Sequence, residues 1–213
     1  MPANTTRLAL PYPLPDDTTD VPRDVKALAE KVDTEARPIL VTSLPGSPVD
    51  GQEVYYVADS AAGVIWHLRY RAAAPGASKW EFVGGPSLHD YSNTTAGPWP
   101  GSTYNLLATP ILVAPLSGEY RVRYDGDIGS TISTAYAWQY AVSINGSVVP
   151  VPHSEAVAAG PNPAGSAVGH SLSKAPDPIV LAAGATVQLL GYNSGGSGIS
   201  NRRSIELLPV RVG

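Results

Sequence analysis

The chain has 213 residues, a formal net charge of −4 and only 15% charged side chains. This length allows one or two domains, and the lack of a basic balance argues against nucleic acid as a partner. The chain has no cysteine, so disulfides and thiolate metal sites are excluded. Glycine and proline, at 21 residues each, favour many short strands joined by turns over a helical enzyme.

Residues 1–19 predict an extended anchoring arm. Prolines alternate here with apolar residues, and each proline biases the preceding residue toward an extended state. The arm is either a disordered tail or a docking peptide that becomes ordered on a partner, with anchors Leu8, Leu10, Tyr12 and Leu14. No segment approaches the roughly 20 apolar residues of a membrane span, so we expect no membrane insertion.

Residues 20–37 predict a helix with one apolar seam. Val21, Val25, Leu28 and Val32 follow heptad spacing, with apolar residues at the a and d positions. A helix this short is marginal alone in water, so it must pack against something. It packs either on its own domain or against other copies, and we expect a trimeric coiled coil because no second helix is predicted nearby.

Residues 38–85 predict a small β shaft domain. The runs EVYYVA, VIWHLRYR and KWEFV are typical of strands and are separated by turn residues. The aromatic core of this unit, or its contact with a second copy, is expected at Trp66, Tyr70, Trp80 and Phe82. Residues 86–102 are rich in glycine and proline and predict a linker in which a neighbour buries Trp99.

Residues 103–213 predict a jelly-roll or β-sandwich knob, which makes the chain mainly β. GEYRVRYDGDI alternates in polarity, and Asn145-Gly146 is the strongest hairpin signal in the chain. Residues 153–176 indicate a long loop, PIVLAAGATVQLLGY indicates a strand–turn–strand pair, and NSGGSGIS indicates a flexible loop. Strands at intervals of about 10 residues with turns between them indicate a sandwich.

The sequence offers little for catalysis. The four histidines have no metal-site spacing, and no nucleophile elbow, phosphate loop or dinucleotide fingerprint occurs. Asp125-Gly126-Asp127 is better explained by a turn than by acid–base or calcium chemistry. We therefore expect no enzyme activity, no cofactor and no resident metal.

The aromatic residues are unusual in their proportions, because 11 Tyr and 4 Trp stand against one Phe. Tyrosine and tryptophan suit surfaces that bind sugars or proteins, because they combine stacking with hydrogen bonding. Candidates for surface recognition in or near predicted loops are Tyr91, Trp99, Tyr136 and Tyr192. The alternative is that these rings pack between the chains of a trimer.

Two stretches resemble known families. LPYPLPDDTTDVPRDVKALAEKVD is similar to the N-terminal segments of fibre and minor tail proteins of phages that infect actinobacteria. SGEYRVRY, VSINGSVV, PIVLAAGATVQLLGY and SIELLPVRV follow the order of motifs in C1q/TNF-like heads, over residues 104–212. Ala185 stands where that family usually has an acidic residue, so its calcium sites are not carried over.

These resemblances imply a structural virion protein of a bacteriophage. The expected molecule is a homotrimeric fibre, anchored to a capsid or tail protein by its N-terminus, with a knob that contacts a host cell-surface glycan. The short chain favours a head fibre over a tail fibre. The alternatives are a capsid decoration protein without receptor binding and a glycan-binding or depolymerase-type module.

Overall fold

The protein is mainly β, with one short helix near the N-terminus. The computed structural model describes residues 3–4, 11–12, 21–35, 39–101, 103–127, 129–130, 137–148, 155–158, 178–194 and 197–213. The predicted helix is confirmed as α1 (Val21–Glu35). Within the described residues, no helix has the length and apolar content needed to cross a membrane.

The N-terminal arm is more structured than a single extended peptide. Strands β1 (Ala3–Asn4) and β2 (Pro11–Tyr12) pair antiparallel, and β2 contacts α1. The arm therefore folds back on itself beside the helix. The expected anchors Leu8, Leu10 and Leu14 lie outside the described residues, and only the backbone of Tyr12 is described.

The predicted strands of the small β unit are all present. Strands β4 (Glu53–Asp59), β5 (Val64–Tyr70) and β6 (Trp80–Gly84) form an antiparallel ladder. Strand β3 (Leu40–Val41) adds to it in parallel. The unit's core aromatics include Trp66 and Trp80, which are 0% and 3% exposed.

The first sheet of the sandwich is built around the C-terminal strand. Strand β18 (Arg203–Val212) pairs with β10 (Gly118–Gly126) on one side and with β7 (Leu88–Ser92) on the other. Strand β15 (Ile179–Leu181) extends the sheet beyond β10.

The second sheet faces the first. Strand β16 (Thr186–Asn193) lies between β9 (Tyr104–Val113) and β12 (Ala137–Ile144). Two short strands, β13 (Ser147–Val148) and β14 (Glu155–Ala158), pair with β12. The chain passes repeatedly between the sheets, which gives the orders β7-β18-β10-β15 and β9-β16-β12-β13/β14 of a jelly roll.

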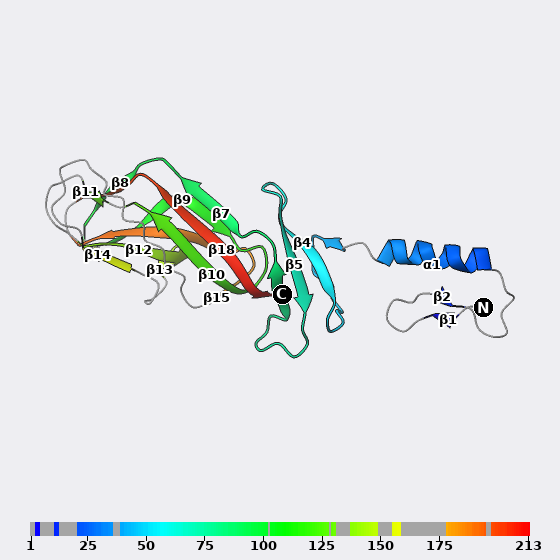
Figure 1. Cartoon of the computed structure of the whole chain (residues 1–213). Coiled ribbons are helices and arrows are strands. Elements are labelled where there is room, and N and C mark those ends of the chain that lie inside the picture. Colours follow the sequence, from blue (N-terminus) through cyan, green and yellow to red (C-terminus); the bar gives the residue numbers. More distant parts are fainter. Residues whose placement is uncertain are drawn as a thin grey trace.

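A third, small sheet closes one end of the sandwich. Strand β17 (Ser197–Ser200) pairs with β8 (Ala96–Pro100) and with β11 (Gly129–Ser130). Figure 1 shows β8 and β11 at the end of the sandwich farthest from β4 and β5. We call this end the distal tip.

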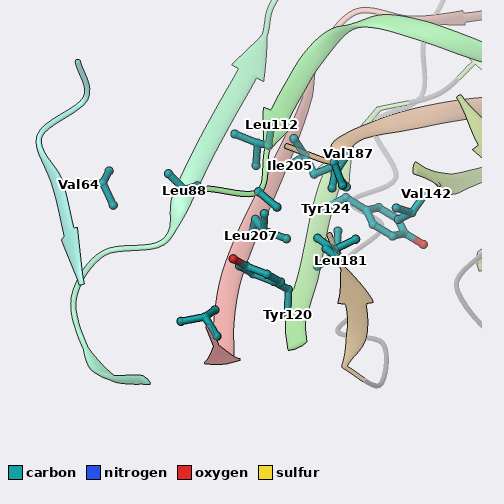
Figure 2. Close-up of a cluster of buried hydrophobic side chains, with 14 of the residues drawn as sticks. Val64, Leu88, Leu112, Tyr120, Tyr124, Val142, Leu181, Val187, Ile205 and Leu207 are labelled. Atoms are coloured by element: carbon teal, nitrogen blue, oxygen red, sulfur yellow. The ribbon is translucent and has the colours of Figure 1, made fainter. Parts of the chain in front are cut away.

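Apolar side chains from both sheets fill one core. Figure 2 shows Tyr120 and Leu207 from the first sheet close to Leu181, with Val142 and Val187 of the second sheet nearby. All five are at most 2% exposed. Asn145 and Gly146, with φ of 50° and 80°, form the predicted turn between β12 and β13.

The expected division into shaft, linker and knob is wrong at residues 86–102. These residues form β7 and β8, which belong to the sandwich and its tip. Strand β6 also pairs with β18, and the rings of Trp66 and Tyr120 lie 6.2 Å apart. The small β unit and the sandwich therefore share one core.

Two further expectations are corrected near the C-terminus. Strands β15 and β16 do not form a hairpin, because the turn at Gly184 carries the chain from one sheet to the other. Residues 197–200, expected in a flexible loop, form β17.

The register of β10 and β18 shifts next to a proline. Pro209, which has no N–H to donate, lies opposite Tyr120 where this shift occurs.

A single shared core predicts one cooperative unfolding transition. Replacing Leu68 of β5, which is 0% exposed, by Ala should cost about 2–5 kcal/mol in the free energy of unfolding. Val49→Ala, at a position 72% exposed, should cost less than about 0.5 kcal/mol. Urea unfolding followed by circular dichroism measures both, and a separate early transition in the Leu68 variant would contradict the shared core.

Candidate functional surfaces

The apolar seam of α1 lies open to solvent. Val25, Leu28 and Val32 are 58%, 39% and 44% exposed, whereas the side chain of Val21 is not among those described. The described residues thus give these three side chains little cover from their own chain. Because exposed apolar area is costly in water, a repeated seam of this kind suits packing against another copy.

The distal tip is held by a buried tryptophan. Trp99 of β8 is 5% exposed, so the expected role in surface recognition does not fit this residue. A Cβ on Gly191 would lie 2.7 Å from the indole Cζ2, and one on Gly198 would overlap Nε1. Both positions therefore need glycine for the indole to lie against the backbone of β16 and β17.

The most buried charge in the described part of the chain is Arg203, the first residue of β18, at 2% exposure. Its Nε donates to the Thr109 carbonyl, and its Nη2 donates to Thr109 Oγ1 at 3.1 Å. Its Nη1 donates to the carbonyls of Thr94 at 2.8 Å and Ser200 at 3.4 Å. The guanidinium thereby joins the starts of β8 and β18 to the middle of β9.

The acceptors of Arg203 are all neutral. Among the described residues, no carboxylate oxygen lies within 4.0 Å of the guanidinium nitrogens. Burial lowers the pKa of Arg203, while the more distant Tyr140 and Asp127 act to raise it. An arginine side chain remains protonated under such conditions, so the site holds a buried cation.

Asp127 organises the turn next to this arginine. Its Oδ1 accepts the backbone N–H groups of Asn201 at 2.7 Å and Arg202 at 2.8 Å. The Tyr140 hydroxyl donates to the Asp127 carbonyl at 2.5 Å and lies 2.7 Å from Ser200 Oγ. This agrees with the expectation that Asp127 has a turn role.

Burial dominates the titration of Tyr140. Desolvation raises the pKa of its hydroxyl, the hydrogen bond with Ser200 opposes the rise, and the charge of Asp127 adds to it. Tyr120, whose hydroxyl donates to the Leu116 carbonyl at 2.7 Å, also has its pKa raised chiefly by burial. Both tyrosines are structural.

A groove of about 520 Å³ opens between β8 and the first half of β9. Residues 94–100, residues 105–109 and Arg203 line it. Arg203 supplies the one charged side chain among these lining residues, and Thr95 and Asn105 add neutral polar groups. We call this hollow the β8–β9 groove.

The remaining aromatic candidates lie apart from one another. Tyr91 on β7 is 62% exposed and stacks on His89, with ring centroids 6.2 Å apart. Tyr192 on β16 is half-buried and lies 5.0 Å from the ring of Tyr104. Tyr136 lies outside the described residues. Among the described residues, Tyr91 and Tyr192 therefore each contact a different neighbouring ring and not each other.

Sequence reasoning did not identify Arg203 or Thr109. Arg203 precedes Ile205 and Leu207 in an alternating strand, so an inward-facing arginine could have been predicted from that pattern. Nothing local marks Thr109, because its role depends on contact with a residue 94 positions away. Within the described residues, no group of three His, Cys, Asp or Glu side chains is placed to hold a metal ion.

Comparison with known proteins gives only distant similarity. No family model matches the chain, and no curated protein matches its sequence. Dimeric latent PorU from Porphyromonas gingivalis is similar over 59% of this chain but 13% of its own, at 12% identity and a TM-score of 0.36. Eiger TNF from S. frugiperda is similar over 60% of this chain and 95% of its own, at 14% identity and a TM-score of 0.31.

The packing of Trp99 predicts a steric cost at Gly198. Gly198→Ala should lower the free energy of unfolding by about 1–3 kcal/mol, because the new methyl group overlaps the indole. Gly46→Ala is the control, since a Cβ there has nothing within 4 Å. Chemical denaturation measures both variants, and equal stability of the two would contradict the packing of the distal tip.

The raised pKa of Tyr140 predicts a loss of stability in alkali. The unfolded chain releases this proton above about pH 10 while the folded chain keeps it, so this contribution is present below pH 10 and is lost as pH rises. Tyr140→Phe should be destabilising at pH 8 through lost hydrogen bonds, and its deficit relative to wild type should shrink at pH 11. Urea titrations at both pH values measure this.

Val49→Ala is the control for that experiment. Val49 is 72% exposed and carries no titratable group. Its effect on the free energy of unfolding should therefore be the same at the two pH values. A deficit of the Tyr140 variant that stays constant from pH 8 to pH 11 would contradict the burial argument.

Proposed function

We propose that the chain is a non-enzymatic structural subunit of a bacteriophage particle, namely a homotrimeric fibre. In this proposal the N-terminal arm binds a capsid or tail protein, α1 associates with its copies, and the sandwich is a knob that contacts the host cell surface. The observation that carries the proposal is the exposed seam of α1, since Val25, Leu28 and Val32 are uncovered in the single chain.

The order of the parts along the chain supports a fibre. Figure 1 shows α1 beyond the small β unit, with the distal tip at the other end of the molecule. An arm, a helix with an apolar seam and a β knob in line are suited to an anchor, a stem and an outward-facing head. In such an arrangement the distal tip is the part of the knob farthest from the anchor.

The proposed number of three chains per fibre is inferred from the sandwich and not from the helix. Valine at the a positions, Val25 and Val32, with leucine at the d position Leu28, is a combination that favours two strands. The expectation of three comes from the resemblance of residues 104–212 to trimeric C1q/TNF-like heads. The helix therefore stabilises an assembly whose symmetry the knob selects.

Light scattering on the full chain tests this proposal. The mass should be three times the 22.2 kDa of one chain. A second sample lacking residues 1–38 keeps the whole buried core. It should remain trimeric, but it should dissociate after less dilution than the full chain does. A monomeric or dimeric full chain would overturn the homotrimer.

The seam has a more specific test. Leu28→Asp should weaken association at micromolar concentration, because association would bury like charges at one layer without partners. Lys26→Asp is a stringent control, because it adds even more negative charge at a side chain that is 75% exposed. Equal dissociation of the two variants in sedimentation experiments would show that charge alone, and not the seam, controls assembly.

A further inference from the structure

We propose that the outer face of the small β unit is an interface between copies of this chain, which continues the contact made by α1. The inference rests on the proposed fibre and deepens it, because it assigns a second contact surface between the chains. Leu40, Tyr55, Ile65 and Val83 form this surface, which we call the outer apolar face.

The outer apolar face lies on the side of the sheet that points away from the core. Successive side chains of a strand point to opposite faces of the sheet. Tyr56 of β4 and Trp66 of β5 are 6% and 0% exposed on the core side. Their neighbours Tyr55 and Ile65 therefore point outward.

Strand pairing brings the residues of this face together. The register places Leu40 of β3 opposite Tyr55 of β4, and Tyr55 opposite His67 of β5. The rings of Tyr55 and His67 are stacked, with centroids 4.8 Å apart. Ile65 precedes His67 by two residues on the same face, and Val83 lies on the neighbouring strand β6. The four strands thus contribute to one continuous surface.

The apolar character of this face is unusual for a side of a sheet that points to water. An antiparallel sheet with one face on the core commonly presents polar residues on the other face. Leu40, Ile65 and Val83 are instead 61%, 37% and 40% exposed in the single chain. A contiguous exposed surface of this kind is typical of contact sites between proteins.

The charged residues beside the outer apolar face are paired within the chain. The carboxylate of Glu53 lies 2.9 Å from His67 Nε2 and 3.3 Å from Arg69 Nε, and Arg71 Nε lies 3.4 Å from the carboxylate of Glu81. Burial of this end in an interface would therefore leave no uncompensated charge. An apolar centre with a polar rim is the usual anatomy of a protein interface.

The short connection to α1 favours a second copy as the occupant. Figure 1 shows β4 and β5 between α1 and the sandwich. Leu40 follows Glu35, the last residue of α1, by five positions, so the two lie within roughly 18 Å even along an extended chain. Chains whose α1 seams pack together must therefore hold their small β units near one another.

This tether gives a second copy an advantage over a separate partner. Contact through α1 makes the meeting of the outer apolar faces intramolecular in effect, which raises their local concentration. Around a symmetry axis, each chain presents the same face toward its copies. The seam of α1 and the outer apolar face then form one interface along the chain, which covers both of the apolar surfaces that the single chain exposes there.

The rate of thiol labelling tests whether assembly covers this face. The chain has no cysteine, so one engineered thiol reports on one position. Val83→Cys places it in the outer apolar face, and Val49→Cys places it in the turn before β4, at 72% exposure. Maleimide labelling of the native full chain is compared with labelling of the same variant unfolded in urea. Val83→Cys should react at least about tenfold more slowly when native, and Val49→Cys almost as fast as when unfolded.

A matched pair of charged variants tests the contribution of the face to assembly. Val83→Asp should raise the concentration at which the full chain dissociates at least about tenfold, because association would bury a carboxylate without a partner. Val49→Asp is the same substitution in the exposed turn and should assemble like wild type. Sedimentation velocity measures both variants, and urea unfolding verifies that both are folded.

The outcomes separate this inference from the proposed fibre. Rapid labelling of Val83→Cys in a trimer, or assembly of folded Val83→Asp at the wild-type concentration, would overturn this inference and leave the fibre intact. Slow labelling of Val83→Cys in a sample that light scattering shows to be monomeric would also overturn it, because the chain would then cover this face itself. A dimer with slow labelling would remove only the trimeric fibre.

Discussion

Strand β18 is the element on which the rest of the structure depends. It pairs with β10 along its length on one side, and on the other side it pairs first with β7 and then with β6. Its alternate residues Ile205 and Leu207 are 0% exposed in the core. One strand therefore joins the sandwich to the small β unit, and neither part has a complete core without it. The small β unit and the sandwich must consequently form together.

The inward-facing residues of β18 are polar at its beginning and apolar further along. Where Ile205 and Leu207 contribute apolar area, Arg203 contributes hydrogen bonds at the equivalent inward position. Near the distal tip, hydroxyl and carbonyl groups of Thr94, Thr109 and Ser200 replace core side chains as the partners of β18. A polar end on an apolar sandwich is costly for stability, but it places hydrogen-bonding groups where a rigid scaffold can present them.

Local sequence patterns predicted the helix, strands and turns better than they predicted which strands pair with one another. The heptad spacing of Val25, Leu28 and Val32 predicted α1, and Asn145-Gly146 predicted the turn between β12 and β13, because both depend on neighbouring residues alone. The turn at Gly184 was also recognised, but a turn signal does not say whether the strands beside it share a sheet. Residues 86–102 looked like a linker because they contain three prolines and two glycines, whereas distant strands determine their pairing.

The candidate site was harder to predict for the same physical reason. The exposure of Tyr91 could be predicted from its position in a polar stretch of the sequence. The burial of Trp99 could not, because it depends on the absence of side chains at Gly191 and Gly198, far along the chain. A groove with one charged residue leaves almost no mark in the sequence. In the proposed trimer the useful strength of surface contact would come from several knobs acting together. A rigid arrangement of the knobs then matters more than the affinity of any one contact, because simultaneous contacts require the distal tips to face the same surface.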